Sequence, residues 1–185
     1  ALNYEDVDLV SIDFEKINEL SIVGNESSRR LGVLKSLLFS MEYYVLENTF
    51  NLYIIDDVNR QLKDFKEKMY TEEYTLDYSR IGEIIIDLEE KFEERYNLLL
   101  QNEGGEKIRM PLQIVVINSK EAIEYISSNK QILERYNKLV KQYKALGISF
   151  IYSNIEDVNV PYGAPEILKR QKENKKVLIT TSKLK

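Results

Sequence analysis

One stretch of the chain combines the residue types and the position needed to bind phosphate. It runs through Gly24, Asn25, Glu26, Ser27, Ser28, Arg29, Arg30 and Leu31. The stretch follows an apolar run at 20–23 and opens a segment with helical spacing, which is the context of the phosphate-binding motif G-x-x-x-x-G-K-[ST]. In that motif, backbone amides surround the phosphates, a lysine neutralises them and a hydroxyl binds magnesium. We therefore treat 24–31 as a candidate phosphate loop.

The candidate loop keeps only the first glycine of the motif. Arg29 stands where a second glycine would let the backbone approach the phosphates, and its side chain obstructs that approach. Arg30 replaces the compact lysine ammonium with a broad planar guanidinium, and Leu31 has no oxygen to offer magnesium. Glu26 adds negative charge inside the loop. Taken alone, the segment is equally well explained as an ordinary turn between a strand and a helix.

A second motif tests this choice, because the acid that positions magnesium normally ends another apolar strand. The run 113–117 supplies a strand but ends in Asn118 and Ser119. Asparagine has nearly the shape of aspartate but carries no charge, so the electrostatic attraction for the metal is lost. We predict no catalytic residue, no metal ligands and no bound cofactor. Asp56 and Asp57, at the end of a different run, are an alternative source of carboxylates, although such residues also commonly cap helices.

The composition excludes several other kinds of function. The net charge of −5 and the sequence pI near 5.1 provide no basic surface for nucleic acid or an anionic membrane. The chain has no cysteine and no histidine, which excludes disulfides, thiolate sites and triads built on either residue. No apolar stretch is long enough to span a bilayer. Because the sequence starts at Ala1 without methionine, we expect a piece of a longer polypeptide.

Apolar runs alternate with segments of helical spacing along the whole chain. Strands are predicted at 20–23, 52–55, 112–117, 148–152 and 177–179. Helical faces are predicted on Leu31, Leu34, Leu38, Met41 and Val45, on Leu88, Phe92, Tyr96 and Leu99, on Ile132, Tyr136, Leu139 and Tyr143, and over 165–173. A small strand on Val10, Ile12 and Phe14 and a surface loop at 102–107 complete the prediction.

This alternation predicts an α/β fold with a mostly parallel sheet and helices on both faces, in three layers. With the candidate loop after the first strand, the fold class is that of P-loop NTPases. We expect residues 1–185 to form one domain, since the length suits a single hydrophobic core.

With both motif positions located, the chain resembles the FtsK/SpoIIIE-like ATPase domains of the type VII secretion coupling proteins EssC and EccC, and most closely the degenerate C-terminal domain of EssC. The segments 20–24, 52–56 and 110–118 carry the resemblance, together with 144–154, which contains Ala145, Leu146, Gly147 and Ile148. Order and spacing contribute more than any single motif. The departures fall at the nucleotide positions Arg29, Arg30, Leu31, Asn118 and Ser119.

The resemblance implies a P-loop NTPase fold of the RecA and FtsK type. It also implies the cytoplasmic end of a ring-forming motor that is anchored in a bacterial cell membrane, with ATP and magnesium bound by the other domains. The implied partners are small helical exported proteins and the other domains and subunits of the motor, with no nucleic acid and no direct membrane contact. We therefore expect a non-catalytic domain that recognises exported proteins or regulates the motor. Two alternatives stay open: a slow but genuine ATPase that uses Asp56, Asp57 or a neighbouring subunit's residues, and a scaffold that caps the ring.

Overall fold

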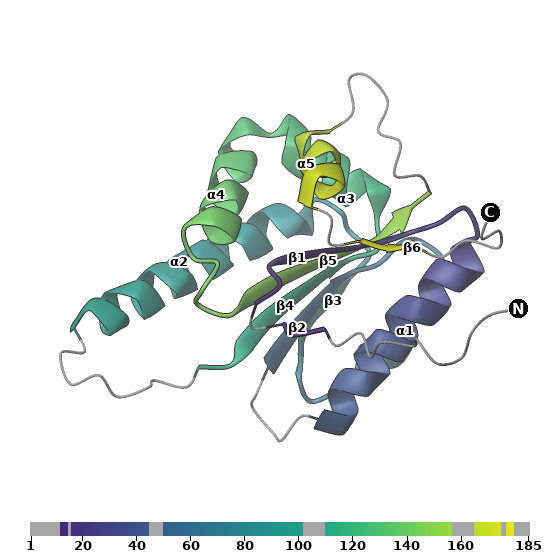
Figure 1. Cartoon of the computed structure of the whole chain (residues 1–185), viewed down its shortest axis with the longest axis horizontal. Helices are drawn as coiled ribbons and strands as arrows, with labels where there is room; N and C mark the ends of the chain where they lie inside the picture. The colour runs from purple at the N-terminus through teal and green to yellow at the C-terminus, as the bar shows by residue number, and fades with distance from the viewer. Residues whose placement is uncertain are drawn as a thin grey trace, which may run out of the picture.

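The computed structural model describes residues 12–14, 16–44, 50–101, 110–156, 165–174 and 177–179, which form one sheet covered by helices on both faces (Figure 1). The sheet has six strands in the order β3-β2-β4-β5-β1-β6, and every neighbouring pair is parallel. The strands are β1 (Glu19–Val23), β2 (Phe50–Ile55), β3 (Thr71–Thr75), β4 (Leu112–Ile117), β5 (Ile148–Ile155) and β6 (Val177–Ile179). The predicted α/β fold is therefore confirmed.

The helices are divided unequally between the two faces of the sheet. Helix α1 (Ser27–Tyr44) lies on one face, and the other face is covered by α2 (Arg80–Gln101), α3 (Lys120–Ser128), α4 (Lys130–Lys141) and α5 (Glu166–Asn174) (Figure 1). A short 3-10 helix, η2 (Lys63–Phe65), connects β2 to β3. Because both faces are covered, the central strands are apolar along nearly their whole length, as the sequence suggested.

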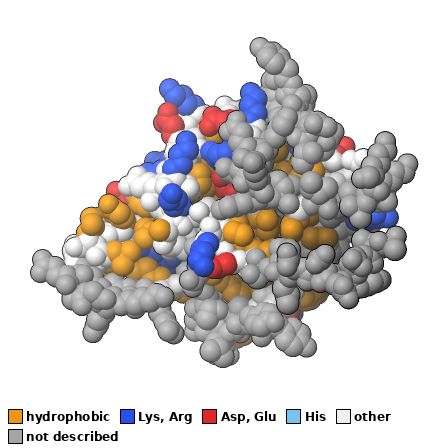
Figure 2. All heavy atoms as spheres, in the orientation of Figure 1, with side chains coloured by type: hydrophobic (Ala, Val, Ile, Leu, Met, Phe, Trp, Pro, Cys, Tyr) orange, Lys and Arg blue, Asp and Glu red, His pale blue; other side chains and the backbone are white. Residues whose placement is uncertain are grey.

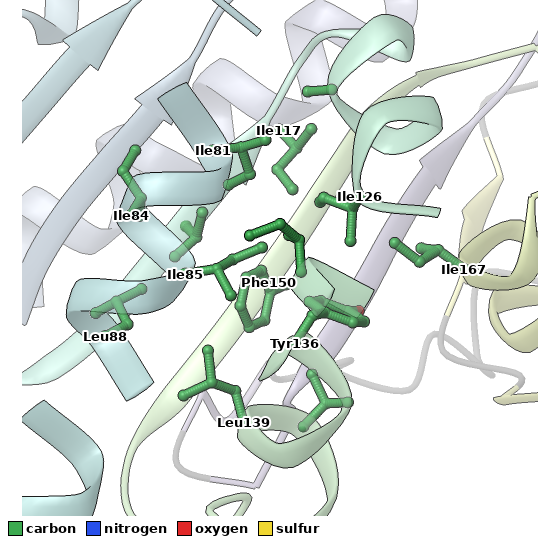
Figure 3. Close-up of a cluster of buried hydrophobic side chains, with 14 of the residues drawn as sticks. Ile81, Ile84, Ile85, Leu88, Ile117, Ile126, Tyr136, Leu139, Phe150 and Ile167 are labelled. Atoms are coloured by element: carbon green, nitrogen blue, oxygen red, sulfur yellow. The ribbon is translucent and has the colours of Figure 1, made fainter. Parts of the chain in front are cut away.

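Alternate residues of each strand pack into two separate hydrophobic clusters. On the α1 side, Leu34 and Leu38 pack with Ile54 and Val116. On the opposite side, Phe150 lies among residues of α2, α3, α4 and α5 (Figure 3). Both clusters are essentially closed to solvent, so the described sheet and helices pack as one unit.

Strand β5 lies between β1 and β4, the strands that lead into the two candidate motifs. Parallel strands place their carboxyl ends at the same edge of the sheet, so the segments after β1, β2, β4 and β5 meet there. The backbone connects them directly: the Gly24 amide donates to the Ile155 carbonyl (3.1 Å) and the Asn118 amide to the Ile55 carbonyl (2.8 Å). This edge is where the candidate site is assembled.

All five predicted strands are present, and β5 continues three residues past its predicted end. Strand β3 and helix α3 were not predicted. The sequence of β3 is polar because it is an edge strand, and α3 is only nine residues long. The strand predicted on Ile12 and Phe14 is absent from the described residues, while Val10, Val45 and the loop at 102–107 lie outside them.

The last turns of α2 extend beyond the sheet (Figure 1). Hydrophobic side chains gather over this end of the helix on the face drawn in Figure 2, and Tyr96, Leu98, Leu99 and Leu100 are all classed as exposed. Arg95 is the last buried residue of the helix. Its guanidinium donates to the carbonyls of Pro111 (2.9 Å) and Leu146 (3.2 Å), which fixes α2 to the segments that precede β4 and β5.

Candidate functional site

The candidate phosphate loop forms the first turn of α1. The Glu26 carbonyl accepts hydrogen bonds from the amides of Arg29 (3.1 Å) and Arg30 (3.2 Å), so the helix begins immediately after it. The Glu26 carboxylate pairs with Arg29 at 2.7 Å, and both side chains are about half exposed. An exposed pair at this spacing contributes little to stability. Arg29 therefore points to the surface, where it neutralises the acid within the loop.

The Arg30 side chain, in contrast to that of Arg29, points into the protein. Its side chain is buried, with 3% of the residue exposed, and its Nη1 donates to the Gly24 carbonyl. Burial lowers the pKa of Arg30, while the nearby negative charge of Glu156 opposes that shift. The guanidinium is therefore bound to the carbonyl of Gly24, which follows β1, and it interacts with the charge of Glu156, which follows β5.

The backbone of Gly24, the first residue of the loop, bonds to other parts of the protein. A phosphate loop directs several amide N–H groups toward its ligand. Here the Gly24 carbonyl faces a cation, and the Gly24 amide is already used by the Ile155 carbonyl at 3.1 Å. Both backbone groups of Gly24, the glycine that matches the motif, are therefore engaged inside the protein.

A buried carboxylate from the neighbouring strand β2 lies beside the second motif. Asp56, at the end of β2, is 0% exposed, and Asn118, at the end of β4, is 3% exposed. The Asp56 carboxylate accepts hydrogen bonds from the Asp57 amide (2.9 Å), the Leu62 amide (2.7 Å), the Tyr74 hydroxyl (2.8 Å) and Asn118 Nδ2 (2.9 Å). Each carboxylate oxygen has two donors. Four hydrogen-bond donors thus satisfy this buried carboxylate.

Tyr74 is the member of this network that sequence reasoning missed. It comes from the edge strand β3, and no local pattern connects it with Asp56. Burial and the adjacent carboxylate raise the pKa of Tyr74, so its hydroxyl keeps its proton and acts as a donor. The network joins three neighbouring strands, β3, β2 and β4, at their carboxyl ends.

The other polar residues of the second motif have local structural roles. Ser119 Oγ accepts from the Ala122 amide at 3.2 Å and caps the start of α3. Asp57 Oδ1 accepts from the Asn59 amide at 2.8 Å and closes a tight turn. The cap on α3 is therefore Ser119. Neither Asp56 nor Asp57 caps an α-helix among the described residues, which differs from the role that the sequence suggested for them.

Within the described part of the chain, no group of three or more histidine, cysteine, aspartate or glutamate side chains is arranged to hold a metal ion. None of the described helices is both long and apolar enough to cross a membrane.

No family model matches this chain, and a search of curated proteins found no match either. Solved structures do match. The cytoplasmic domain of the Thermomonospora curvata type VII secretion ATPase EccC aligns over 94% of this chain with a TM-score of 0.69 and 15% identity. The cytoplasmic domain of EssC aligns over 90% with a TM-score of 0.67 and 18% identity. This chain has the fold of these ATPase domains.

A third match is EccC ATPases 2 and 3 from Thermomonospora curvata in complex with a signal sequence peptide, with 78% of this chain aligned, a TM-score of 0.60 and 15% identity. The present chain spans only 20%, 33% and 26% of the three matched chains, respectively. At 15–18% identity, these matches show a shared fold alone.

Proposed function

We propose that this chain is a non-catalytic, ATPase-like domain of a type VII secretion motor, and that it recognises exported proteins or regulates the motor. In this proposal, residues 1–185 form one domain on the cytoplasmic side of a bacterial cell membrane, and its place in the parent protein is that of the degenerate C-terminal domain of EssC. The burial of Arg30 against the Gly24 carbonyl carries the non-catalytic part of the proposal.

A triphosphate would have to displace Arg30 from a protein acceptor and then bind a loop whose first carbonyl faces inward. Magnesium would find no hydroxyl at Leu31, an amide at Asn118 and an Asp56 carboxylate that already accepts four hydrogen bonds. Because metal ions provide much of the charge stabilisation in phosphoryl transfer, hydrolysis has no electrostatic support here. The four hydrogen bonds to Asp56 also disfavour the alternative of a slow ATPase that uses this carboxylate.

The recognition part of the proposal rests on the shared fold. EccC, whose ATPases 2 and 3 were solved in complex with a signal sequence peptide, has the same arrangement of sheet and helices at 15% identity. We propose small helical exported proteins as partners, together with the other domains and subunits of the motor. ATP and magnesium would be bound by other domains, and this domain would contact neither nucleic acid nor the membrane directly.

Isothermal titration calorimetry with magnesium ATP tests the non-catalytic part. We expect no saturable heat up to about 1 mM nucleotide, which corresponds to less than about 4 kcal/mol of binding free energy. The Arg29→Ala variant serves as a control, because it removes an exposed arginine from the same loop. Saturable binding tighter than about 1 mM, or ATP turnover that is lost in an Arg30→Ala variant, would contradict the proposal.

Nuclear magnetic resonance tests the recognition part separately. The isotope-labelled domain is titrated with a signal sequence peptide from an exported helical protein, and with a scrambled peptide of equal composition. Saturable shifts caused by the first peptide alone support recognition. An unchanged spectrum would contradict recognition by this domain and favour a scaffold that only caps the ring.

A further inference from the structure

A buried cluster of polar side chains lies at the amino end of β1, far along the strand from the candidate loop. It joins Glu19 of β1, Tyr136 of α4, Tyr152 of β5 and Arg170 of α5. Both tyrosines are 0% exposed, and the side chains of Glu19 and Arg170 are 7% and 15% exposed. Neither the candidate phosphate loop nor the Asp56 network uses any of these groups.

The Arg170 guanidinium is held on several sides by different chemical groups. Its Nη2 and Nε donate to Glu19 Oε1 at 3.0 and 3.2 Å. Its Nη1 donates to the side-chain oxygen of Asn137. The guanidinium carbon lies 4.9 Å from the centre of the Tyr136 ring. A carboxylate, an amide oxygen and an aromatic face are the groups that recognise a planar guanidinium, and together they discriminate against an ammonium.

The groups around the guanidinium are positioned without help from α5. The Tyr136 hydroxyl donates to Glu19 and also contacts the Tyr152 hydroxyl, and its ring packs edge-on against Phe150 at 4.9 Å. Glu19 belongs to a strand that is hydrogen-bonded to β5. Burial raises the pKa of both tyrosines, so both hydroxyls keep their protons at neutral pH. The pocket is therefore formed by β1, β5 and α4.

Helix α5 depends on this pocket for its position. It has nine residues, a length at which isolated helices are marginal in water. Ile167 extends from α5 into the hydrophobic cluster beside Ile126 and Tyr136 (Figure 3). Leu168 is only partly buried, and Glu166 and Lys169 are exposed. Among residues 166–170 of α5, Ile167 is the fully buried residue and Arg170 carries the enclosed charge.

We propose that Glu19, Tyr136 and Asn137 form a guanidinium-binding site that Arg170 occupies within the same chain, so that α5 is attached to β1 as a latch. The site selects a planar guanidinium over an ammonium of the same charge. Because α5 leads into β6, which pairs with β1, release of Arg170 also loosens the edge of the sheet beside β1. This inference does not depend on the proposed function.

Chemical rescue tests the site directly. The Arg170→Ala variant is expected to melt at a lower temperature, and added methylguanidinium is expected to restore part of the loss by occupying the vacated pocket. A ligand at about five times its Kd shifts the folding equilibrium about sixfold, which raises the melting temperature of a domain of this size by about 2–4 °C. Methylammonium serves as the ligand control. Arg135→Ala serves as the protein control, because Arg135 is 43% exposed in its pair with Glu89.

Rescue of Arg170→Ala by methylguanidinium, with none by methylammonium and none in Arg135→Ala, supports a guanidinium site. Equal effects of both cations, or no effect of either, would overturn it. If Arg170→Ala fails to fold, the milder Asn137→Ala variant replaces it, and amide hydrogen exchange is measured by mass spectrometry. Exchange at least tenfold faster in α5 and β6, with α2 unchanged, supports the latch, and an unchanged exchange rate in α5 would overturn it.

Discussion

Restoring the acid of the second motif should destabilise the protein. Asn118→Asp would place a second carboxylate about 3 Å from Asp56 in a closed site, since the present Nδ2 lies 2.9 Å from Asp56 Oδ1. Two charges at about 3 Å repel by roughly 5 kcal/mol at an effective dielectric constant of about 20. The alternative at pH 7 is that the two carboxyls share one proton. Because an ordinary aspartate has a pKa near 3.9, keeping that proton costs only about 4 kcal/mol of folding free energy. Protonation is the smaller cost, so it sets the expected loss.

The loss should depend on pH in a defined direction. The pKa of the new carboxyl is raised in the folded protein, so the penalty is absent below about pH 4 and grows as the pH rises. We expect a loss of about 1.5 kcal/mol at pH 5 and about 4 kcal/mol at pH 7. Urea unfolding of both proteins across this range measures the difference, at equal ionic strength and with the slopes compared as a test of two-state behaviour.

Asn59→Asp is the matched control, because Asn59 is exposed and its amide lies 3.3 Å from Asp57 Oδ2. It makes the same change of an amide to a carboxylate beside an aspartate in solvent, and should cost less than about 1 kcal/mol. Magnesium should rescue neither variant. If Asn118→Asp is as stable as the parent at pH 7, or if millimolar magnesium stabilises it, the reasoning that the four hydrogen bonds replace a metal ion is refuted.

Three further changes test individual contacts by urea unfolding. Tyr74→Phe removes a hydroxyl that donates to the buried carboxylate at 2.8 Å and should cost about 1.5–3 kcal/mol; an unchanged midpoint would contradict that role. Gly147→Ala should lower the free energy of unfolding by about 1–3 kcal/mol because φ is +87° at this position. Gly32→Ala is the control, since Gly32 lies in an open helical position, and it should raise the free energy of unfolding by about 0.5–1 kcal/mol. Equal effects of the two changes would be inconsistent with backbone strain at Gly147. Burial raises the pKa of Glu89, but hydrogen bonds such as that from Lys138 lower it below its usual value. Glu89→Gln should therefore cost about 2 kcal/mol of unfolding free energy at pH 7. This loss should begin to shrink as the pH falls below about 4.3 and should disappear only below the lowered pKa of the folded protein. A loss that does not change with pH would exclude the ion pair.

The sequence was sufficient to predict the sheet and most of its helices, because the signals involved are strong. Central strands such as 112–117 are apolar along nearly their whole length, since helices cover both faces. Edge strand β3 was missed for the same physical reason, because a strand with one neighbour does not need an apolar sequence. The parallel orientation of the strands followed from the alternation of strands and helices.

The candidate site was located by sequence, but its internal contacts were not. The sequence indicated that Arg30 and Asn118 would not support nucleotide chemistry. It could not indicate that Arg30 turns toward Gly24 while Arg29 pairs with Glu26, because adjacent arginines have the same local pattern. The role of Asp56 was also hidden, since two of its donors come from segments distant in sequence. Such contacts are set by tertiary packing.

The most direct test is a crystal structure of the domain grown with millimolar magnesium and a non-hydrolysable ATP analogue. Our account predicts that Arg30 stays buried against the Gly24 carbonyl and that Asn118 stays bonded to Asp56, with no triphosphate between them. An ordered triphosphate and metal ion between Gly24 and Asn118, with Arg30 displaced, would contradict it.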